Sequence, residues 1–547
     1  MTRTSGNKDS DKKQIKVDSS ASFMDHQDTG AFSRLVYDFV ADAQALRPFQ
    51  SFRPDAAGFR QAVQARSEVP VDREALCAAI RDTHASRPLS DKQASHLEAL
   101  SETGTFTICT AHQPNIFTGY LYFVYKILHT IRLAEELSNE MPEHRFVPVF
   151  FMGSEDNDLD ELGQFRLHDL KLTWLTGQQG AVGRMKVDAG LTDLIRSIAG
   201  AYGHLPYGAP LVEALEDAYQ KGITIAEATF RFVDHLFASH GLLILQADRS
   251  SLKRQMIPVF REELLHGASQ PLVEATIAEL ERGDYKIQVH PREINLFYLT
   301  DGLRNRIVRS DEGFVVDGTE LQFSRDEMLA ELETHPERFS PNVILRGLYQ
   351  ETIMPNIAFI GGGSEVAYWM ELKGLFAHYG VPFPVLVLRN SFLLVDQQQA
   401  ARVAGSGWSI EQLFRPVPDL MNEYVRRVSG HRTDVSPEIS EIRDIYKRMR
   451  AMATDIDPTL QAHVDALEKK ACDRLESLSA KMLRAEKRRH SEMQRKLESL
   501  RAALFPGGLQ ERYENILPYY ATYGPGIIDV IHRHSQARDM RFGIITL

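Results

Sequence analysis

Length, composition and charge describe an ordinary globular chain and exclude several other classes. The chain has 547 residues, of which 43% are hydrophobic and 25% charged, enough for several domain equivalents with buried cores. Its 63 Lys and Arg against 74 Asp and Glu give a formal charge of -11, which argues against a general nucleic-acid binder. No run approaches the roughly 18 apolar residues of a membrane span. We therefore expect neither nucleic acid nor a membrane as a partner.

The cysteines and the N-terminus favour a cytoplasmic chain. Cys77, Cys109 and Cys472 are widely spaced and form no CxxC pair, so we predict neither a disulfide framework nor a thiolate metal site. Residues 1–23 are polar and lack the apolar centre of a signal peptide. We predict that this segment is disordered.

Five short apolar runs predict buried parallel strands. They are Thr105–Ala111, Phe146–Met152, Leu242–Gln246, Asn356–Ile360 and Phe383–Leu388, each bounded by Gly, Pro or polar residues. Leu121 to Leu137 and Val366 to Tyr379 have helical spacing, so strands alternate with helices. The order predicts an α/β fold with a Rossmann-like, doubly wound core whose ligands bind at the carboxyl ends of the strands.

The remaining segments are interpreted as additions to this core. We predict core segments at 24–166, 241–253 and 342–430, interrupted by inserted subdomains at 167–240 and 254–341. Residues 431–505 read as a helical hairpin, and 506–547 as a segment that returns to the core.

The hairpin has the pattern of a coiled coil. Its first helix begins at Ser436-Pro437, a good N-cap followed by Pro. The second begins near Asp457-Pro458 and keeps heptad-like apolar positions over about 70 Å at 1.5 Å per residue. The first helix is too short to cover this stripe, which predicts a homodimer; the alternative is packing against the chain's own core. We interpret the basic stretch 481–501 as a solvated face.

The first candidate site is the turn after the first predicted strand. His112, Gln113 and Asn115 stand where a strand passes into a helix. Exposed N–H groups and the helix dipole favour an anion at such a position. The alternative is a loop histidine that hydrogen-bonds the backbone.

The second candidate site is an acidic turn after the second strand, formed by Glu155, Asp156, Asn157 and Asp158. Mutual repulsion raises carboxyl pKa values, which suits such groups to bind an amine, coordinate Mg²⁺ or act as a base. The alternative is ordinary acidic capping of a helix.

The third candidate site surrounds a glycine triplet. Glycine lets the backbone approach a ligand closely, a guanidinium can hold a carboxylate bidentately, and aromatic side chains can wall a sugar or base. The alternatives are a plain turn and core packing. The candidate binding residues of this group are Arg346, Gln350, Gly361, Gly362, Gly363, Glu365, Tyr368, Trp369, Lys373 and Arg389.

Four segments together resemble a known family. They read TAHQPNIFTGYLYFVYKILHTIRLAEEL, PVFFMGSEDNDLDE, NVILRGLYQETIMPNIAFIGGGSEVAYWMELK and GGLQERYENILPYYATYG, and in order and spacing they are similar to the BshC cysteine ligases of bacillithiol biosynthesis. The resemblance covers residues from about 32 to the C-terminus. It implies a Rossmann-like core with two inserted subdomains, a coiled-coil dimerisation arm, and the last step of that synthesis, in which L-cysteine joins the glucosamine amine of malyl-glucosamine.

The resemblance leads to a hypothesis for the site. Amide formation requires an activated carboxylate, and ATP with Mg²⁺ is one possible energy source; no dedicated metal site is expected. Nucleotide phosphate would lie near residues 112–115 and the glycine triplet. The catalytic candidates Glu155, Asp156 and Asp158 would hold the cysteine ammonium or the sugar amine. Arg346 or Arg389 would engage the malyl carboxylates.

Two other function classes stay open at the level of sequence. One is a non-catalytic coiled-coil scaffold whose α/β domain binds a nucleotide or a sugar without turnover. The other is an enzyme acting on tRNA, related to aminoacyl-tRNA synthetases, which would need a basic surface and is disfavoured by the net charge.

Overall fold

The computed structural model describes residues 17–167 and 170–547, and the chain divides into two compact units. Of the described residues, 17–27, 31–167, 170–394 and 507–547 form the first unit, and 28–30 and 395–506 form the second. Within the described ranges, no helix is both long and apolar enough to cross a lipid bilayer.

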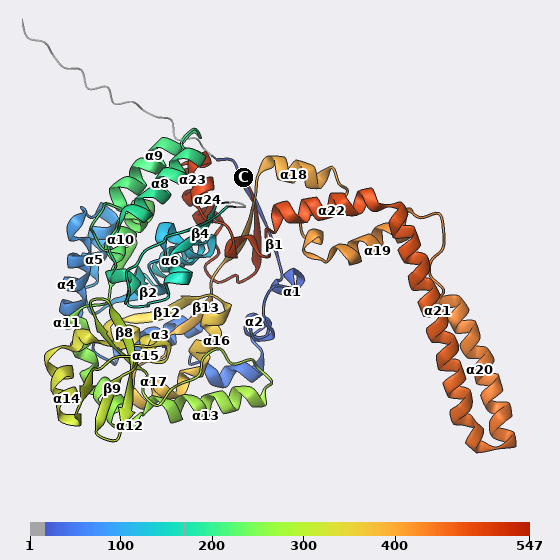
Figure 1. The fold of residues 1–547 in the computed structure, drawn as a ribbon, viewed down its shortest axis with the longest axis horizontal. Coiled ribbons are helices and arrows are strands. Elements are labelled where there is room, and N and C mark those ends of the chain that lie inside the picture. The colour runs from blue at the N-terminus through green and yellow to red at the C-terminus, as the bar shows by residue number, and fades with distance from the viewer. Residues whose placement is uncertain (1–16, 168–169) are drawn as a thin grey trace, which may run out of the picture. The chain divides into compact units, whose positions relative to one another are not determined.

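A five-stranded parallel sheet lies at the centre of the first unit (Figure 1). Its strands are β2 (Thr105–His112), β3 (Arg145–Met152), β6 (Leu243–Gln246), β12 (Asn356–Gly361) and β13 (Val385–Leu388). They lie in the order β13-β12-β2-β3-β6, and every neighbouring pair is parallel. All five strands predicted from sequence are confirmed. The strand order reverses between β2 and β12, which makes this pair the topological switch point of a doubly wound fold.

The strands are continuous apolar runs because both faces of the sheet are buried. Val149 and Phe151 of β3 belong to one core cluster with residues of α15 (Val343–Ile353). Phe150 and Met152, which point to the opposite face, belong to a second cluster with residues of α6 (Leu121–Glu140). Alternate side chains thus pack against helices on both sides, as parallel sheets require.

Helices connect and cover the sheet. The predicted helix after β2 is α6, which leads into β3. The helical pattern after β12 is divided into α16 (Gly363–Glu371) and α17 (Lys373–Tyr379). The other helices of this part are α2 (Arg34–Val40), α3 (Ala56–Ser67), α4 (Arg73–Thr83), α5 (Asp91–Ala99), α7 (Leu159–Leu162) and α11 (Ser250–Lys253).

Two insertions interrupt the core. The first contains a hairpin of β4 (Gln164–Leu167) and β5 (Leu170–Thr173), followed by α8 (Ala189–Tyr202), α9 (Gly208–Ala218) and α10 (Ile225–Phe237). The second contains α12 (Ile257–His266), α13 (Ser269–Arg282), α14 (Arg325–Thr334) and a sheet in the order β10-β9-β8-β7-β11. Those strands are β7 (Leu296–Thr300), β8 (Leu303–Ser310), β9 (Gly313–Val316), β10 (Gln322–Phe323) and β11 (Phe339–Pro341).

The two ends of the described chain pair with each other. β1 (Ser20–Met24) lies antiparallel to β15 (Phe542–Thr546), in a small sheet that also holds β14 (Ser391–Val395). Residues 1–23 were predicted to be disordered. Of these, residues 1–16 lie outside the described part of the chain. For Ser20–Phe23 the prediction was wrong, because the strand's partner lies more than 500 residues away. Helices α23 (Leu517–Tyr523) and α24 (Gly526–His534) precede β15.

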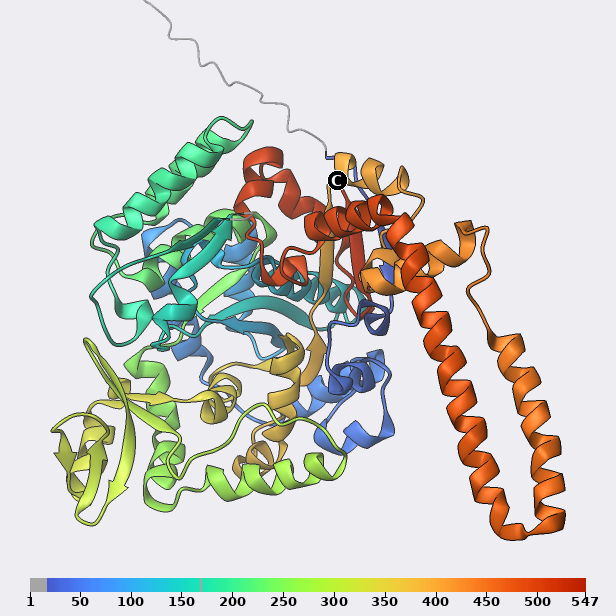
Figure 2. The same cartoon turned by 45° about the vertical axis from the view of Figure 1, so that its right-hand side comes forward.

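The second unit is helical. It contains α18 (Gln397–Ala404), α19 (Val417–Val428), α20 (Ser436–Ile456), α21 (Gln461–Arg489) and α22 (Ser491–Leu504), and α20 and α21 form an antiparallel hairpin (Figure 2). Ion pairs from Arg450 to Asp465 and to Glu468 join the two helices. The sequence predicts one continuous second helix, but the structure divides it at His490. Lys487, Arg488 and Arg489 fill the last turn of α21, where the helix dipole favours cations.

Candidate active site

A pocket of about 530 Å³ opens at the carboxyl ends of the core strands, at the switch point between β2 and β12. Segments from five distant parts of the chain build it. It is lined by Ala111, His112, Gln113, Tyr122, Gly153, Asp156, Glu161, Pro341, Asn342, Val343, Arg346, Gly362, Gly363, Ser364, Glu365, Tyr368, Arg389 and Arg512.

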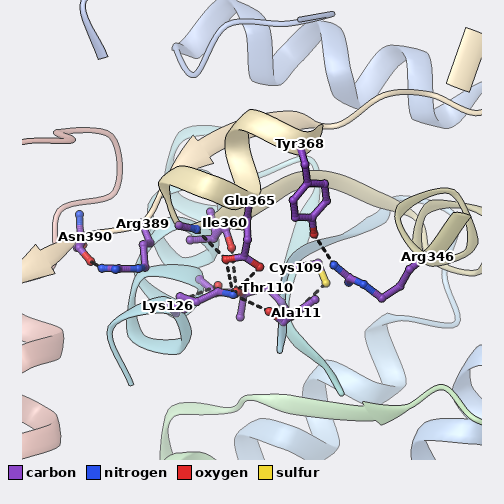
Figure 3. A network of polar contacts seen from close by, with 12 residues as sticks. Cys109, Thr110, Ala111, Lys126, Arg346, Ile360, Glu365, Tyr368, Arg389 and Asn390 are labelled. Atoms are coloured by element: carbon purple, nitrogen blue, oxygen red, sulfur yellow. Dashed lines mark hydrogen bonds and ion pairs between the residues drawn. The ribbon is translucent and has the colours of Figure 1, made fainter. Parts of the chain in front are cut away.

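A buried ion pair lies under the floor of the pocket (Figure 3). Lys126 of α6 is 1% exposed, and its Nζ donates to Glu365 Oε1 at 2.9 Å, to Glu365 Oε2 at 2.7 Å and to the Ala111 carbonyl at 2.6 Å. Glu365 also accepts the Gly362 N–H at 2.8 Å, which caps the start of α16. Burial acts to raise the pKa of Glu365, but Lys126 and this N–H outweigh it, so its pKa lies below the usual range. The pocket therefore contains a carboxylate that is ionised at neutral pH.

His112 presents a neutral imidazole beside this pair. Burial and the Lys126 ammonium lower the pKa of His112 to about 3. Its ring lies 5.5 Å from the rings of Tyr122 and Phe123. A histidine with this pKa can exchange hydrogen bonds at neutral pH but is a weak base.

Arg346 is a guanidinium of the pocket lining that has no carboxylate partner among the described residues. It reaches across from α15, and its Nη2 donates to the Tyr368 hydroxyl of α16 (Figure 3). Within the described part of the chain, no carboxylate forms an ion pair with it. Because a half-buried guanidinium has several further N–H donors, this side chain is suited to hold an anionic group.

Asp156 is held in the pocket by two neighbours. Gln113 Nε2 donates to Asp156 Oδ2 at 3.0 Å, and Arg304 of β8 forms an ion pair with Oδ1 at 3.2 Å. Arg304 is 6% exposed, and it also donates to Ser340 Oγ and to Asn157 Oδ1. The second insertion thus positions an acid of the core pocket.

Arg389 also lines the pocket, but its terminal nitrogens are occupied. Nη1 and Nη2 donate to the two carboxylate oxygens of Glu511 at 2.9 and 2.8 Å. Nη1 further donates to Ser391 Oγ at 2.9 Å. This fork joins β13 to the C-terminal segment and neutralises the charge of Arg389.

Two of the three acids predicted to be catalytic lie outside the pocket lining. Glu155 pairs with Lys253 of α11, which is 0% exposed and also holds Asp248. Burial raises the pKa of Glu155, and Lys253 opposes the rise. Asp158 is the N-cap of α7, where it accepts the Glu161 N–H at 3.1 Å.

Other predicted residues serve the framework. Asn157 is exposed and hydrogen-bonds Arg304, whereas Asn115 is 1% exposed beside Gly119. Gln350 is buried, and its Nε2 donates to Glu351 Oε1 at 2.8 Å. Gly361 ends β12.

Trp369 and Lys373 also contribute to packing. The Trp369 ring stacks on Phe359 with 4.4 Å between centroids and is 0% exposed. Lys373 donates to Ser51 and lies 5.4 Å from the Phe383 ring. The structure thus brings nine of the predicted residues together in one pocket, and the other predicted residues lie outside its lining. The nine are His112, Gln113, Asp156, Arg346, Gly362, Gly363, Glu365, Tyr368 and Arg389.

Several residues in and beside the pocket were not among the predicted site residues. Lys126 interrupts an otherwise apolar stretch of α6, and this lone charge was the available signal. Glu161 follows the acidic turn directly, and Arg512 lies in the C-terminal segment that carries the family resemblance. Tyr122 and Asn342 lie in segments that carry the family resemblance, but neither was predicted to bind a ligand. Among the residues that the structure describes, no group of three or more His, Cys, Asp or Glu side chains is arranged to hold a metal ion.

Comparison with known proteins gives matches over nearly the whole chain. The family model described as "Bacillithiol biosynthesis BshC, N-terminal Rossmann-like domain" matches residues 20–390, and the model of the "C-terminal coiled-coil domain" matches residues 392–547. Three similar proteins carry the name "Putative cysteine ligase BshC". The one from Flavobacterium johnsoniae is 36% identical, covering 95% of this chain and 99% of its own. The protein from Flavobacterium psychrophilum is 35% identical, and the match covers 95% of this chain and 98% of that protein. The protein from Cytophaga hutchinsonii is 35% identical, and the match covers 90% of this chain and 92% of that protein.

Proposed function

Since the chain belongs to the BshC family of bacillithiol biosynthesis, we propose that it is a ligase that joins L-cysteine to the glucosamine amine of malyl-glucosamine. The pocket at the switch point carries this proposal. It offers an unpaired guanidinium and fixed carboxylates within one cavity, which suits substrates that contain both carboxylate and amine groups.

The reaction forms one amide bond. The cysteine carboxylate first attacks a phosphorus of ATP. Attack at the α-phosphorus gives an acyl-adenylate and releases pyrophosphate, whereas attack at the γ-phosphorus gives an acyl-phosphate and releases ADP. The neutral sugar amine then attacks the acyl carbon, the nucleotide or phosphate leaves with the bonding electron pair, and the amine loses a proton. Arg346 holds a substrate carboxylate, and the carboxyl groups of Glu365 and Asp156 hold the ammonium form of an amine before it reacts.

We propose ATP with Mg²⁺ as the energy source. The first turn of α16 supports a phosphate site, because the amides of Gly363 and Ser364 have no partner within the helix. Glu365 already accepts the Gly362 N–H, so a phosphate would bind beside this carboxylate, where Mg²⁺ would relieve the repulsion.

The test is mass spectrometry of the purified protein with malyl-glucosamine, cysteine, ATP and Mg²⁺, with each component omitted in turn. We expect the cysteinyl conjugate in the complete mixture only. Asp156→Asn and Asp158→Asn form a matched pair, since both remove one charge from the same turn. The first is expected to lower kcat/KM and the second to leave it unchanged. Binding of substrates without any conjugate would favour the non-catalytic scaffold.

We further propose that the protein is a cytoplasmic homodimer joined through α20 and α21. The three cysteines are free and buried, as expected in a reducing compartment. On the hairpin, apolar side chains face solvent, and Met452 and Ile456 are 67% and 81% exposed. Together with the heptad pattern, this favours a second copy as the cover. A monomeric mass by light scattering would refute the dimer, and Ile456→Glu is expected to weaken it.

A further inference from the structure

The charges of the pocket can be accounted for pair by pair. Asp156 is neutralised by Arg304, Glu365 by Lys126 and Arg389 by Glu511. In each pair the partner lies outside the pocket lining. Each pair is neutral as a whole, so the six groups add no net charge to the pocket, although the Asp156 and Glu365 carboxylates can still accept hydrogen bonds from a substrate ammonium.

Three charged groups of the lining remain. Arg346 and Arg512 are guanidinium groups, and Glu161 is a carboxylate. Over the described ranges of the chain, none of the three forms an ion pair with another side chain. Two unpaired cations against one unpaired anion favour a ligand that carries two negative groups and one positive group.

Arg512 is fixed at the pocket by its neighbours. It ends a short 3₁₀ turn, Gln510–Arg512, in which Gln510 exchanges hydrogen bonds with the backbone of Leu394 at 2.8 and 3.0 Å. Glu511 holds Arg389. The two preceding residues thus anchor the turn on the core, and Arg512 alone is left exposed.

An aromatic ring supports the guanidinium. Arg512 Cζ lies 5.4 Å from the centroid of the Phe32 ring, and Phe32 lies close to Gly363 at the start of α16. Stacking on an aromatic face leaves the in-plane N–H donors of an arginine free for a carboxylate.

We propose that Arg512 is a substrate-binding residue that takes one carboxylate of a dicarboxylate ligand while Arg346 takes the other. The inference rests on the proposed function, in which the malyl group supplies both carboxylates. It assigns a role to the C-terminal segment, whose similarity to the family is high but for which sequence reasoning named no site residue. Arg512 thus takes the place of Arg389, which the sequence offered as a ligand for the malyl carboxylates but whose guanidinium is occupied by Glu511.

The test compares ligands with one and two carboxylates on the full-length protein. Calorimetry with malate and with lactate as probes is done on the unmodified protein, on Arg512→Gln and on Arg166→Gln. The last is the matched control, because Arg166 also stacks on an aromatic ring, Tyr513, at 5.6 Å but does not line the pocket. Circular dichroism checks that each variant is folded.

We expect Arg512→Gln to weaken malate binding at least about tenfold, the size of one lost charge-assisted hydrogen bond, and to leave lactate binding unchanged. Arg166→Gln should bind both as the unmodified protein does. In the ligase assay, Arg512→Gln should raise KM for malyl-glucosamine with kcat little changed.

Three outcomes would overturn the inference: unchanged malate affinity in Arg512→Gln, equal weakening of malate and lactate, or no malate binding by the unmodified protein. Failure of the proposed function is separate, since it would appear as absence of the conjugate while the preference for malate and its loss in Arg512→Gln persist.

Discussion

Replacement of Lys126 by methionine tests whether the pocket depends on its buried ion pair. The ammonium makes three hydrogen bonds, two of them to Glu365. Removing one partner of a buried pair usually costs about 3 to 5 kcal/mol, because the remaining charge is left without compensation. The Glu365 side chain keeps 23% of its exposure, so some solvation remains, and we expect a loss near 3 kcal/mol in the free energy of unfolding.

The assay is urea unfolding of the unmodified protein, Lys126→Met, Glu365→Gln and the double variant. The double variant removes both charges and should recover part of the loss, which a double-mutant cycle measures as the coupling energy. In Lys126→Met the main group that depresses the pKa of Glu365 is gone, and burial raises that pKa above the unfolded value. Stability is then lost as pH rises, so the deficit should be smaller at pH 5 than at pH 8. A deficit below about 1 kcal/mol, or a double variant no more stable than Lys126→Met, would refute the reasoning.

Three further substitutions give expected outcomes. Burial raises the pKa of Glu351 from 4.5 to about 7, so protonation of this group favours the folded state. About 3 kcal/mol of stability should therefore be lost as the pH rises from 4.5 past 7. Glu351→Gln should flatten this part of the pH profile of urea unfolding, and an unchanged slope would contradict the raised pKa of Glu351. Lys253→Met leaves Glu155 and Asp248 without their shared cation and should lower the free energy of unfolding by about 3 to 5 kcal/mol. Thermal or urea unfolding measures this loss, and an unchanged free energy of unfolding would show that the two acids are solvated. Asp158→Ala removes the N-cap of α7 and should lower the free energy of unfolding by about 1 kcal/mol without reducing conjugate formation. Loss of activity at unchanged stability would show that Asp158 is a catalytic residue after all.

The core could be predicted from sequence because its signal is local. Each strand of the central sheet is a short apolar run between breakers, and the polar residues that follow it, such as His112 and Asp156, lie at the carboxyl edge of the sheet by topology alone. The strand β1 could not be predicted this way, because Ser20–Met24 is short, has no continuous apolar run and becomes a strand only by pairing with β15.

The division of labour within the site could not be predicted, since it depends on partners far away in sequence. Glu155 and Asp156 are adjacent and chemically alike, but Lys253 withdraws the first into a buried pair and Arg304 fixes the second in the pocket. Arg346 and Arg389 gave the same signal, and only the distant Glu511 distinguishes them. Composition of a motif shows where charges gather, and long-range pairing decides which of them remain available to a ligand.

The fork between Arg389 and Glu511 also has a consequence for synthesis on the ribosome. All five strands of the central sheet have been translated by Leu388, yet the carboxylate that neutralises Arg389 follows 122 residues later, after the whole helical hairpin. At about 5 to 20 residues per second, the nascent core waits on the order of ten seconds with Arg389, at the end of the edge strand β13, lacking its carboxylate partner. The cavity is thus completed only when translation is almost finished, so a chain that terminates prematurely within the hairpin would retain the sheet but not a finished binding site.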